Sequence, residues 1–151
     1  MIEDVDRIMD VMAAAFDPQW GEAWNRNQVS SSLAVPTTHY RLIGADGKPP
    51  EEGAMAAGFS MVRAAPGEEE LLLIGVKPDN RGKGIGWRLL ELFADDARKR
   101  GAERIFLEMR ENNPAISLYH SFGFNQIGRR PRYYKMPDGN RIDAITYGMN
   151  L

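Results

Sequence analysis

Cysteine is absent from this chain of 151 residues, and histidine occurs only at His39 and His120. Without a thiol the chain can form no disulfide, thiolate zinc site, iron–sulfur cluster or cysteine acyl-enzyme. Two histidines also disfavour a metal site built from several imidazoles. We therefore expect a protein that needs no metal ion.

Strong net charge and long apolar runs are lacking as well. The 19 basic and 21 acidic side chains leave a net charge of −2, which produces no field that would gather nucleic acid. No apolar stretch reaches the roughly 18 residues that a membrane span needs, and the sequence after Met1 has no signal-peptide pattern. These absences predict a cytoplasmic protein without DNA or membrane partners.

The residues that are present predict one folded domain over residues 1–151. The composition is 43% hydrophobic and 9% aromatic, which is enough to bury a core at this length. Apolar residues recur every three or four positions over residues 4–16, which predicts an amphipathic helix that Asp4 caps. A second short helix is expected between Pro18 and Pro36.

Apolar runs and turn residues predict the remaining elements. Residues 71–76 form a nearly continuous apolar run, which predicts a central strand buried on both faces. The helix that follows is expected to pair Asp95 with Lys99 and Asp96 with Arg100, one turn apart. In order, we expect a strand hairpin (38–45 and 54–65), the central strand, a helix (87–100), a strand (104–109), a helix (114–122) and strands (124–128 and 142–149). This order predicts a mixed α/β fold.

Three alternate glycines, Gly82, Gly84 and Gly86, separate the central strand from that helix. Backbone N–H groups can converge in such a loop, and the helix N-terminus adds a partial positive charge, so the pattern suits a phosphate or a pyrophosphate. The Walker pattern requires a glycine where this chain has Lys77, and the dinucleotide-binding pattern requires a glycine where it has Trp87, so neither pattern matches. A plain tight turn between strand and helix is the alternative.

The pattern that remains, Arg81-x-x-Gly84-x-Gly86, resembles the acetyl-CoA pyrophosphate loop of the GNAT superfamily of N-acetyltransferases. The downstream segments resemble the bacterial RimI-type ribosomal-protein-alanine N-acetyltransferases; they are Leu107-Glu108-Met109-Arg110, Ala115-Ile116-Ser117-Leu118-Tyr119 and Gly123-Phe124. The resemblance covers residues 71–151 and extends more loosely to the first helix. It implies a single-domain GNAT-type α/β fold with a mixed central sheet flanked by helices, although the strand that precedes the first helix in this family is missing or rudimentary here.

The resemblance also implies which residues act. Acetyl-CoA would be the co-substrate, and its contacts would come from Ile74, Val76, Arg81, Gly82, Lys83, Gly84, Ile85, Gly86 and Asn112. Asn113 is the alternative to Asn112, because the chain before Tyr119 is one residue shorter than the family pattern. Glu108 would act as general base on the acceptor amine through water, and Tyr119 as general acid to the CoA thiolate. Residues 71–76 carry no polar side chain that could serve as the base, which favours Glu108.

These roles predict direct transfer of an acetyl group from acetyl-CoA to a primary amine in a ternary complex. A protein α-amine is favoured over lysine, because its pKa of about 7.7 to 8.0 leaves more of it neutral at pH 7 than lysine's pKa of about 10.4 does. The resemblance implies the N-terminal alanine of a small-subunit ribosomal protein, with residues 16–24, Tyr133 and Tyr134 lining the peptide groove. Acetylation of a small-molecule amine and a non-catalytic acetyl-CoA sensor are the alternatives.

The basic residues near the C-terminus, Arg129, Arg130, Arg132 and Lys135, could contact RNA. Four charges on an acidic chain are more typical of a solvated hairpin or of a contact with an acidic partner. His120 is expected to lie at the surface. We therefore expect a protein or peptide partner rather than RNA.

Overall fold

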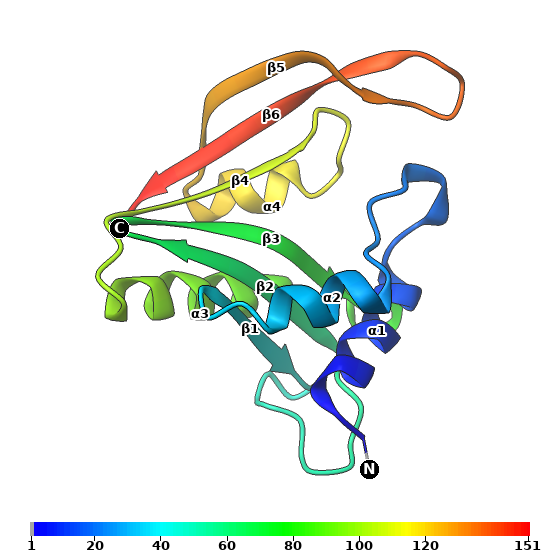
Figure 1. Ribbon diagram of the computed structural model, residues 1–151, viewed down its shortest axis with the longest axis vertical. Coiled ribbons are helices and arrows are strands. Elements are labelled where there is room, and N and C mark those ends of the chain that lie inside the picture. Colours follow the sequence, from blue (N-terminus) through cyan, green and yellow to red (C-terminus); the bar gives the residue numbers. More distant parts are fainter. Residues whose placement is uncertain (1) are drawn as a thin grey trace.

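The computed structural model describes residues 2–151 and contains one six-stranded mixed sheet with the strand order β1-β2-β3-β4-β6-β5 (Figure 1). The strands are β1 (Thr38–Ile43), β2 (Gly58–Ala65), β3 (Glu68–Val76), β4 (Arg104–Arg110), β5 (Asn125–Lys135) and β6 (Arg141–Asn150). Neighbouring strands are antiparallel except for β3 and β4, which are parallel. The expected mixed α/β fold, the first hairpin and the central place of β3 are confirmed.

Helices pack against the sheet in two groups. They are α1 (Asp4–Ala15), α2 (Arg26–Leu33), α3 (Ile85–Lys99) and α4 (Ile116–Phe122), with 3₁₀ turns at Pro18–Trp20 and Pro78–Asn80. One buried cluster joins α1 and α2 to β2 and β3 and contains Ile8, Met12 and Phe59. Another joins α3 and α4 to β4 and β6 and contains Phe93 and Ile105. No helix in the described part of the chain is long and apolar enough to cross a membrane.

The polar residues of α3 pair differently from the prediction, although its apolar stripe is buried as expected. Asp96 accepts two hydrogen bonds from Arg41 on β1, at 2.8 and 2.7 Å. Arg100 donates in the same way to Glu69 on β3, at 2.8 and 2.7 Å. Asp95 pairs within the helix with Arg98, three residues onward, and not with Lys99. The predicted pairs are wrong because a bidentate, partly buried ion pair with a residue of the sheet is more stable than an exposed ion pair along the helix.

The start of α1 also differs from the prediction. Glu3, not Asp4, is the capping residue, because the side chains of Glu3 and Asp6 each accept a hydrogen bond from the other residue's backbone N–H. Asp4 instead accepts a hydrogen bond from Arg7 at 2.9 Å. Among residues 2–151 no strand precedes α1, and β1 forms the edge of the sheet.

Two strand boundaries depend on pairing that the sequence pattern does not show. Residues 54–57 were expected to begin β2, but the strand starts at Gly58, where pairing with Val76 begins. β5 was expected to end at residue 128, but it continues to Lys135 because it stays paired with β6 through an irregularity between Arg130 and Tyr134. Most side chains of β5 are exposed, so no apolar alternation marks its second half.

The parallel strands β3 and β4 separate partway along their length, and Figure 1 shows them diverging. Paired positions run only from Glu68 and Arg104 to Glu70 and Phe106. Beyond this point β3 stays paired with β2, and β4 stays paired with β6 as far as Arg110. Residues 72, 74 and 76 are only half-buried, as are residues 68 and 70 on the same face of the paired part, which corrects the prediction of a strand buried on both faces. The sheet opens where the two strands separate.

Candidate active site

A groove of about 1020 Å³ occupies the opening between β3 and β4. One wall consists of residues 71–76 of β3 and the glycine loop with the first turn of α3. The other consists of the end of β4, the start of α4 and the connection between α1 and α2. Most of the predicted site residues lie on these walls; they are Ile74, Val76, Arg81, Gly82, Gly84, Ile85, Gly86, Glu108 and Tyr119. Lys83 and Asn112 do not line the groove.

The glycine loop presents a row of unpaired backbone donors. Gly82 and Gly84 adopt left-handed conformations, with φ of 77° and 80°. Within residues 2–151, the N–H groups of residues 82–87 donate to no acceptor, and the N–H of Arg88 is the first to return to the chain, at Gly84 O. A Cβ atom built on Gly82 or Gly84 would meet no atom within 4 Å. Free N–H groups at the start of a long helix, with open space in front of them, are suited to hold an anion.

The side chain of Arg81 supports the loop instead of facing a ligand. Its Nε donates to Val76 O at 3.2 Å, and its Nη2 donates to Ala15 O at 2.9 Å. The guanidinium group thus links the end of β3 to the C-terminal carbonyl groups of α1, which carry partial negative charge. Only the backbone of this residue remains available to an anion.

Backbone groups of β3 face the opening as well. Lys77 N–H donates to Ala57 O at 2.8 Å, on the β2 side of the strand. Because successive residues of a strand direct their backbone groups to opposite edges, those of Val76 and Ile74 point toward the opening. The hydrogen bond from Arg81 to Val76 O confirms this direction. The unpaired edge can accept one more extended chain.

Glu108 and Tyr119 bring a carboxylate and a phenol to the same groove. Glu108 is bound by Arg130, whose Nε lies 3.0 Å from its Oε2, and by Thr146, whose Oγ1 donates to the same oxygen at 3.4 Å. The Tyr119 side chain is 5% exposed and packs edge-on against Phe124. Burial raises the pKa of Tyr119 well above its usual value of 10.0, and the charge of Glu22 raises it further. The hydroxyl group therefore keeps its proton at neutral pH.

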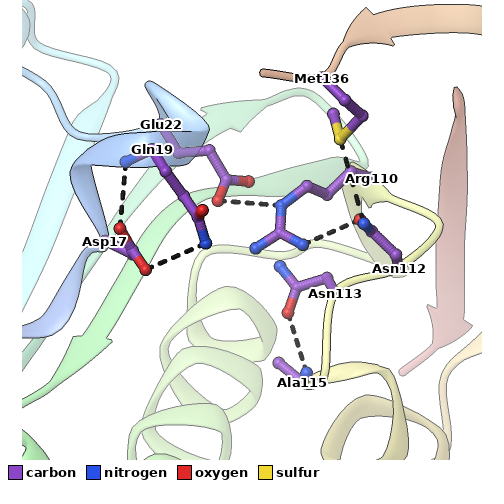
Figure 2. A network of polar contacts seen from close by, with 8 residues as sticks. All are labelled: Asp17, Gln19, Glu22, Arg110, Asn112, Asn113, Ala115 and Met136. Carbon is purple, nitrogen blue, oxygen red and sulfur yellow. Dashed lines mark hydrogen bonds and ion pairs between the residues drawn. The ribbon is translucent and has the colours of Figure 1, made fainter. Parts of the chain in front are cut away.

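The two neighbouring asparagines lie differently. Asn113 lines the groove, and its Oδ1 accepts a hydrogen bond from the N–H of Ala115 at 2.8 Å, which leaves its amide nitrogen without a described acceptor. Asn112 is exposed, and its Oδ1 accepts from Arg110 at 2.9 Å (Figure 2). The alternative that the sequence left open, Asn113, is therefore the better placed of the two.

Glu22 and Arg110 form a charged pair that the sequence did not predict. Arg110 is 5% exposed, its Nε lies 3.2 Å from Glu22 Oε1, and its guanidinium carbon lies 4.0 Å from the ring centroid of Trp20. Figure 2 shows Glu22 reaching Arg110 from the connection between α1 and α2. The pair joins residues 88 positions apart, so no local spacing could reveal it. The cluster of Trp20, Glu22 and Trp24 was the available signal.

The rest of the expected peptide wall is present in part. Phe16, Trp20, Trp24 and Tyr134 line the groove, whereas Tyr133 is exposed and does not. Burial raises the pKa of Tyr134, and the charges of Glu108 and Glu22 add to the shift. Within residues 2–151 no group of three or more histidine, aspartate or glutamate side chains is arranged to hold a metal ion.

The basic cluster belongs to the hairpin of β5 and β6. Arg129 is bound between Glu111 and Asp143, and Asp143 also accepts the N–H of Arg132 at 2.9 Å. Arg132 has a φ of 54°, which marks the irregularity in β5. The expected solvated hairpin is thus observed, and His120 is exposed as predicted.

A model of the acetyltransferase (GNAT) family matches residues 5–124. The match includes the glycine loop, Glu108 and Tyr119, and it ends before β5. The ribosomal protein bS18-alanine N-acetyltransferase of Escherichia coli (strain K12) is 43% identical over 129 residues, which cover 85% of this chain and 81% of that protein.

Two further comparisons extend over more of the chain. The N-alpha-acetyltransferase RimI of Mycobacterium tuberculosis (strain H37Rv) is 36% identical over 151 aligned positions, covering 95% of this chain and 84% of that protein. The crystal structure of the ribosomal-protein-S18-alanine N-acetyltransferase from Escherichia coli is similar with a TM-score of 0.79 and 29% identity, covering 99% of this chain and 90% of that chain. The likeness therefore includes the hairpin of β5 and β6.

Proposed function

The chain belongs to the acetyltransferase (GNAT) family, and from this membership we propose that it transfers an acetyl group from acetyl-CoA to a protein α-amine, the N-terminal alanine of ribosomal protein bS18. The observation that carries the proposal is one continuous groove. Its loop wall offers the free N–H groups of residues 82–87, and its other wall carries Glu108 and Tyr119. An anion site and a proton-transfer pair thus share one space.

The residues present fit acetyl-CoA, which supplies the reactive thioester. The N–H groups of residues 82–87 would hold the diphosphate, since they are unpaired and lie at the positive end of α3. The backbone groups of Ile74 and Val76 would bind the amides of the pantetheine arm as an added strand. The free amide nitrogen of Asn113 supports a further contact with this arm, in place of the contact first expected from Asn112.

The reaction requires two proton transfers, and the chain offers one group for each. The attacking amine must lose a proton as the N–C bond forms, and Glu108 would accept it through water. The C–S bond breaks in the same transfer, and the sulfur would take a proton from Tyr119. The raised pKa of Tyr119 means that the hydroxyl carries the proton that the sulfur would need, whereas the buried site makes release of this proton depend on the thiolate that forms beside it.

The acceptor wall supports an α-amine at the end of an extended chain. Phe16, Trp20 and Trp24 provide apolar surface, while Glu22 and Glu108, each paired with an arginine, provide carboxylate oxygens that can accept a hydrogen bond from an amine. An α-amine also loses its proton more readily than lysine, whose pKa is about 10.4. One water-linked carboxylate is therefore sufficient for it.

The test is CoA release with matched peptides. A peptide that starts with alanine and contains one internal lysine is compared with the same peptide blocked at its N-terminus, and with small diamines. We expect turnover only with the free N-terminus, with the acetyl group located there by mass spectrometry. Modification of lysine alone would overturn the α-amine assignment, faster turnover of the diamines would favour a small-molecule acetyltransferase, and binding of CoA without any turnover would indicate a sensor.

A further inference from the structure

Trp87 lies in the first turn of α3, directly after the glycine loop. It lines the groove and is 40% exposed, which is unusual for the largest side chain type. Its ring packs edge-to-face against Phe122 of α4, with 4.9 Å between centroids and an angle of 68° between planes. The indole ring is therefore held in place by α4 while much of its surface stays open to solvent.

Trp87 also belongs to the segment whose backbone is suited to hold an anion. The backbone N–H of Trp87 is one of the unpaired donors of residues 82–87, and Leu118 of α4, which lies against Gly86 in the same turn and also lines the groove, is apolar. Among the described residues that line the groove, the acidic ones are Asp17, Glu22 and Glu108, which come from other segments. A flat aromatic surface thus lies directly beside a site suited to a diphosphate.

Resting on the function proposed above, we propose that Trp87 stacks on the adenine ring of CoA and forms a nucleobase subsite of this protein. The diphosphate of CoA has pantetheine on one side and adenosine on the other. If the pantetheine arm follows β3 inward along Ile74 and Val76, the adenosine must leave on the outer side of the loop. Trp87 lies on that side, and it is the large aromatic ring there that the structure leaves exposed.

The size of the effect follows from stacking energies. Loss of one base–aromatic stack typically weakens binding by about 1–3 kcal/mol, which corresponds to about 5- to 150-fold in Kd. The effect should be confined to ligands that contain the base. A ligand that ends at the phosphate, such as 4′-phosphopantetheine, uses the groove and the loop but reaches no stacking surface.

The experiment is a calorimetric titration of CoA and of 4′-phosphopantetheine into the wild type and three variants. Trp87→Leu keeps an apolar contact with Phe122 but removes the aromatic face, and Trp87→Phe keeps a smaller aromatic face. Arg88→Ala is the matched control, because Arg88 is exposed on the same turn and does not line the groove. Circular dichroism and thermal melting verify that each variant is folded.

We expect Trp87→Leu to weaken CoA binding by about 5- to 150-fold, Trp87→Phe to weaken it less, and Arg88→Ala to leave it unchanged. Binding of 4′-phosphopantetheine should be the same in all four proteins. An equal loss for both ligands would show that Trp87 supports the loop and not the base, and unchanged CoA binding in Trp87→Leu would also overturn the subsite. Failure of the wild type to bind either ligand would instead overturn the proposed function.

Discussion

The two walls of the groove are built in different ways. The wall proposed to bind acetyl-CoA, residues 71–87, is called the cofactor wall and offers backbone groups from one contiguous segment. The wall proposed to receive the amine, residues 16–24, 107–119 and 134, is called the acceptor wall and offers side chains from segments far apart in the chain. On the cofactor wall the side chain of Arg81 is occupied with the carbonyl groups of Val76 and Ala15.

The difference predicts opposite sensitivities. A wall made of backbone groups tolerates changes of exposed side chains but not a change that alters its φ angles. A wall made of charged and aromatic side chains tolerates small backbone shifts but not the loss of one member of a pair. Substitutions on the two walls should therefore separate cofactor affinity from turnover.

The largest effect is expected on the acceptor wall, at Tyr119. Tyr119→Phe keeps the packing against Phe124 but removes the proton donor, so kcat should fall by about 10² to 10⁴-fold while acetyl-CoA affinity stays within about twofold. Tyr147→Phe is the matched control, because Tyr147 is also buried but does not line the groove. Steady-state kinetics measure kcat, and calorimetry measures the affinity for acetyl-CoA. Unaltered turnover in Tyr119→Phe would mean that Tyr119 contributes to packing and not to proton transfer.

On the cofactor wall the largest effect is expected at Gly84. Gly84→Asp places a side chain on a left-handed residue and a negative charge at the anion site, so the Kd for acetyl-CoA should rise by at least about 100-fold. Gly47 has the same conformation, with φ of 81° and no atom within 4 Å of a built Cβ, but it lies in a remote turn. Gly47→Asp should destabilise the protein by about as much as Gly84→Asp does but leave the affinity for acetyl-CoA unchanged. Equal affinities in the two variants would remove the loop from the cofactor site.

Glu108→Gln tests the acceptor wall through the pH dependence of kcat/KM. Glu108→Gln keeps the shape but cannot accept a proton, so kcat/KM should fall by roughly 10² near pH 7. The loss should shrink above pH 8, where an α-amine of pKa about 8 arrives neutral, whereas a lysine acceptor would recover only near pH 10. Glu103→Gln, an exposed position outside the groove, is the control. Wild-type rates in Glu108→Gln from pH 6 to 9 would exclude Glu108 from the mechanism.

The sequence predicts the cofactor wall well because its information is local. The spacing of Gly82, Gly84 and Gly86 after an apolar strand places the loop, and the order of strands and helices follows from periodicity. The opening between β3 and β4 is not visible in this way, because it depends on how many residues of two distant strands pair. An apolar run such as residues 71–76 looks the same whether it faces a core or a groove.

The acceptor wall is predicted less completely because pairs that cross the fold leave no local spacing. Glu22 pairs with Arg110 on this wall, and the same holds elsewhere in the fold, where Asp96 of α3 pairs with Arg41 of β1 instead of with the residue one turn along its helix. In each case a partner brought in by tertiary packing gives a less exposed, better oriented pair than a neighbour in sequence. The roles of Glu108 and Tyr119 were inferred from a motif, and they stay predictions until the variants are measured.

A smaller effect, on stability, is expected from Glu22. Glu22→Gln leaves the buried guanidinium group of Arg110 without its counter-charge, so the free energy of unfolding should fall by about 1–3 kcal/mol. Adding Arg110→Met should restore part of the loss. Glu70→Gln removes an exposed pair with Arg63 and should cost less than about 1 kcal/mol, which makes it the control. Urea titration measures the free energy of unfolding of the wild type and of these three variants. Equal losses for Glu22→Gln and Glu70→Gln would contradict a structural role for the buried pair.

The smallest effect is expected at Gly86, although it belongs to the same glycine pattern as Gly84. Its φ is not left-handed, and a Cβ built there lies 3.2 Å from Leu118 Cδ2, so its small size serves contact between α3 and α4. Gly86→Ala gains roughly 0.5–1 kcal/mol of helix propensity and loses a similar amount by crowding a side chain that can move. We expect acetyl-CoA affinity to change by less than about 10-fold, because the anion site uses the N–H and not the α-hydrogen of this residue. Pairing Gly86→Ala with Leu118→Val relieves the crowding and should raise the melting temperature above that of Leu118→Val alone. A Kd for Gly86→Ala as high as that of Gly84→Asp would show that the ligand itself, and not α4, fills the space in front of Gly86.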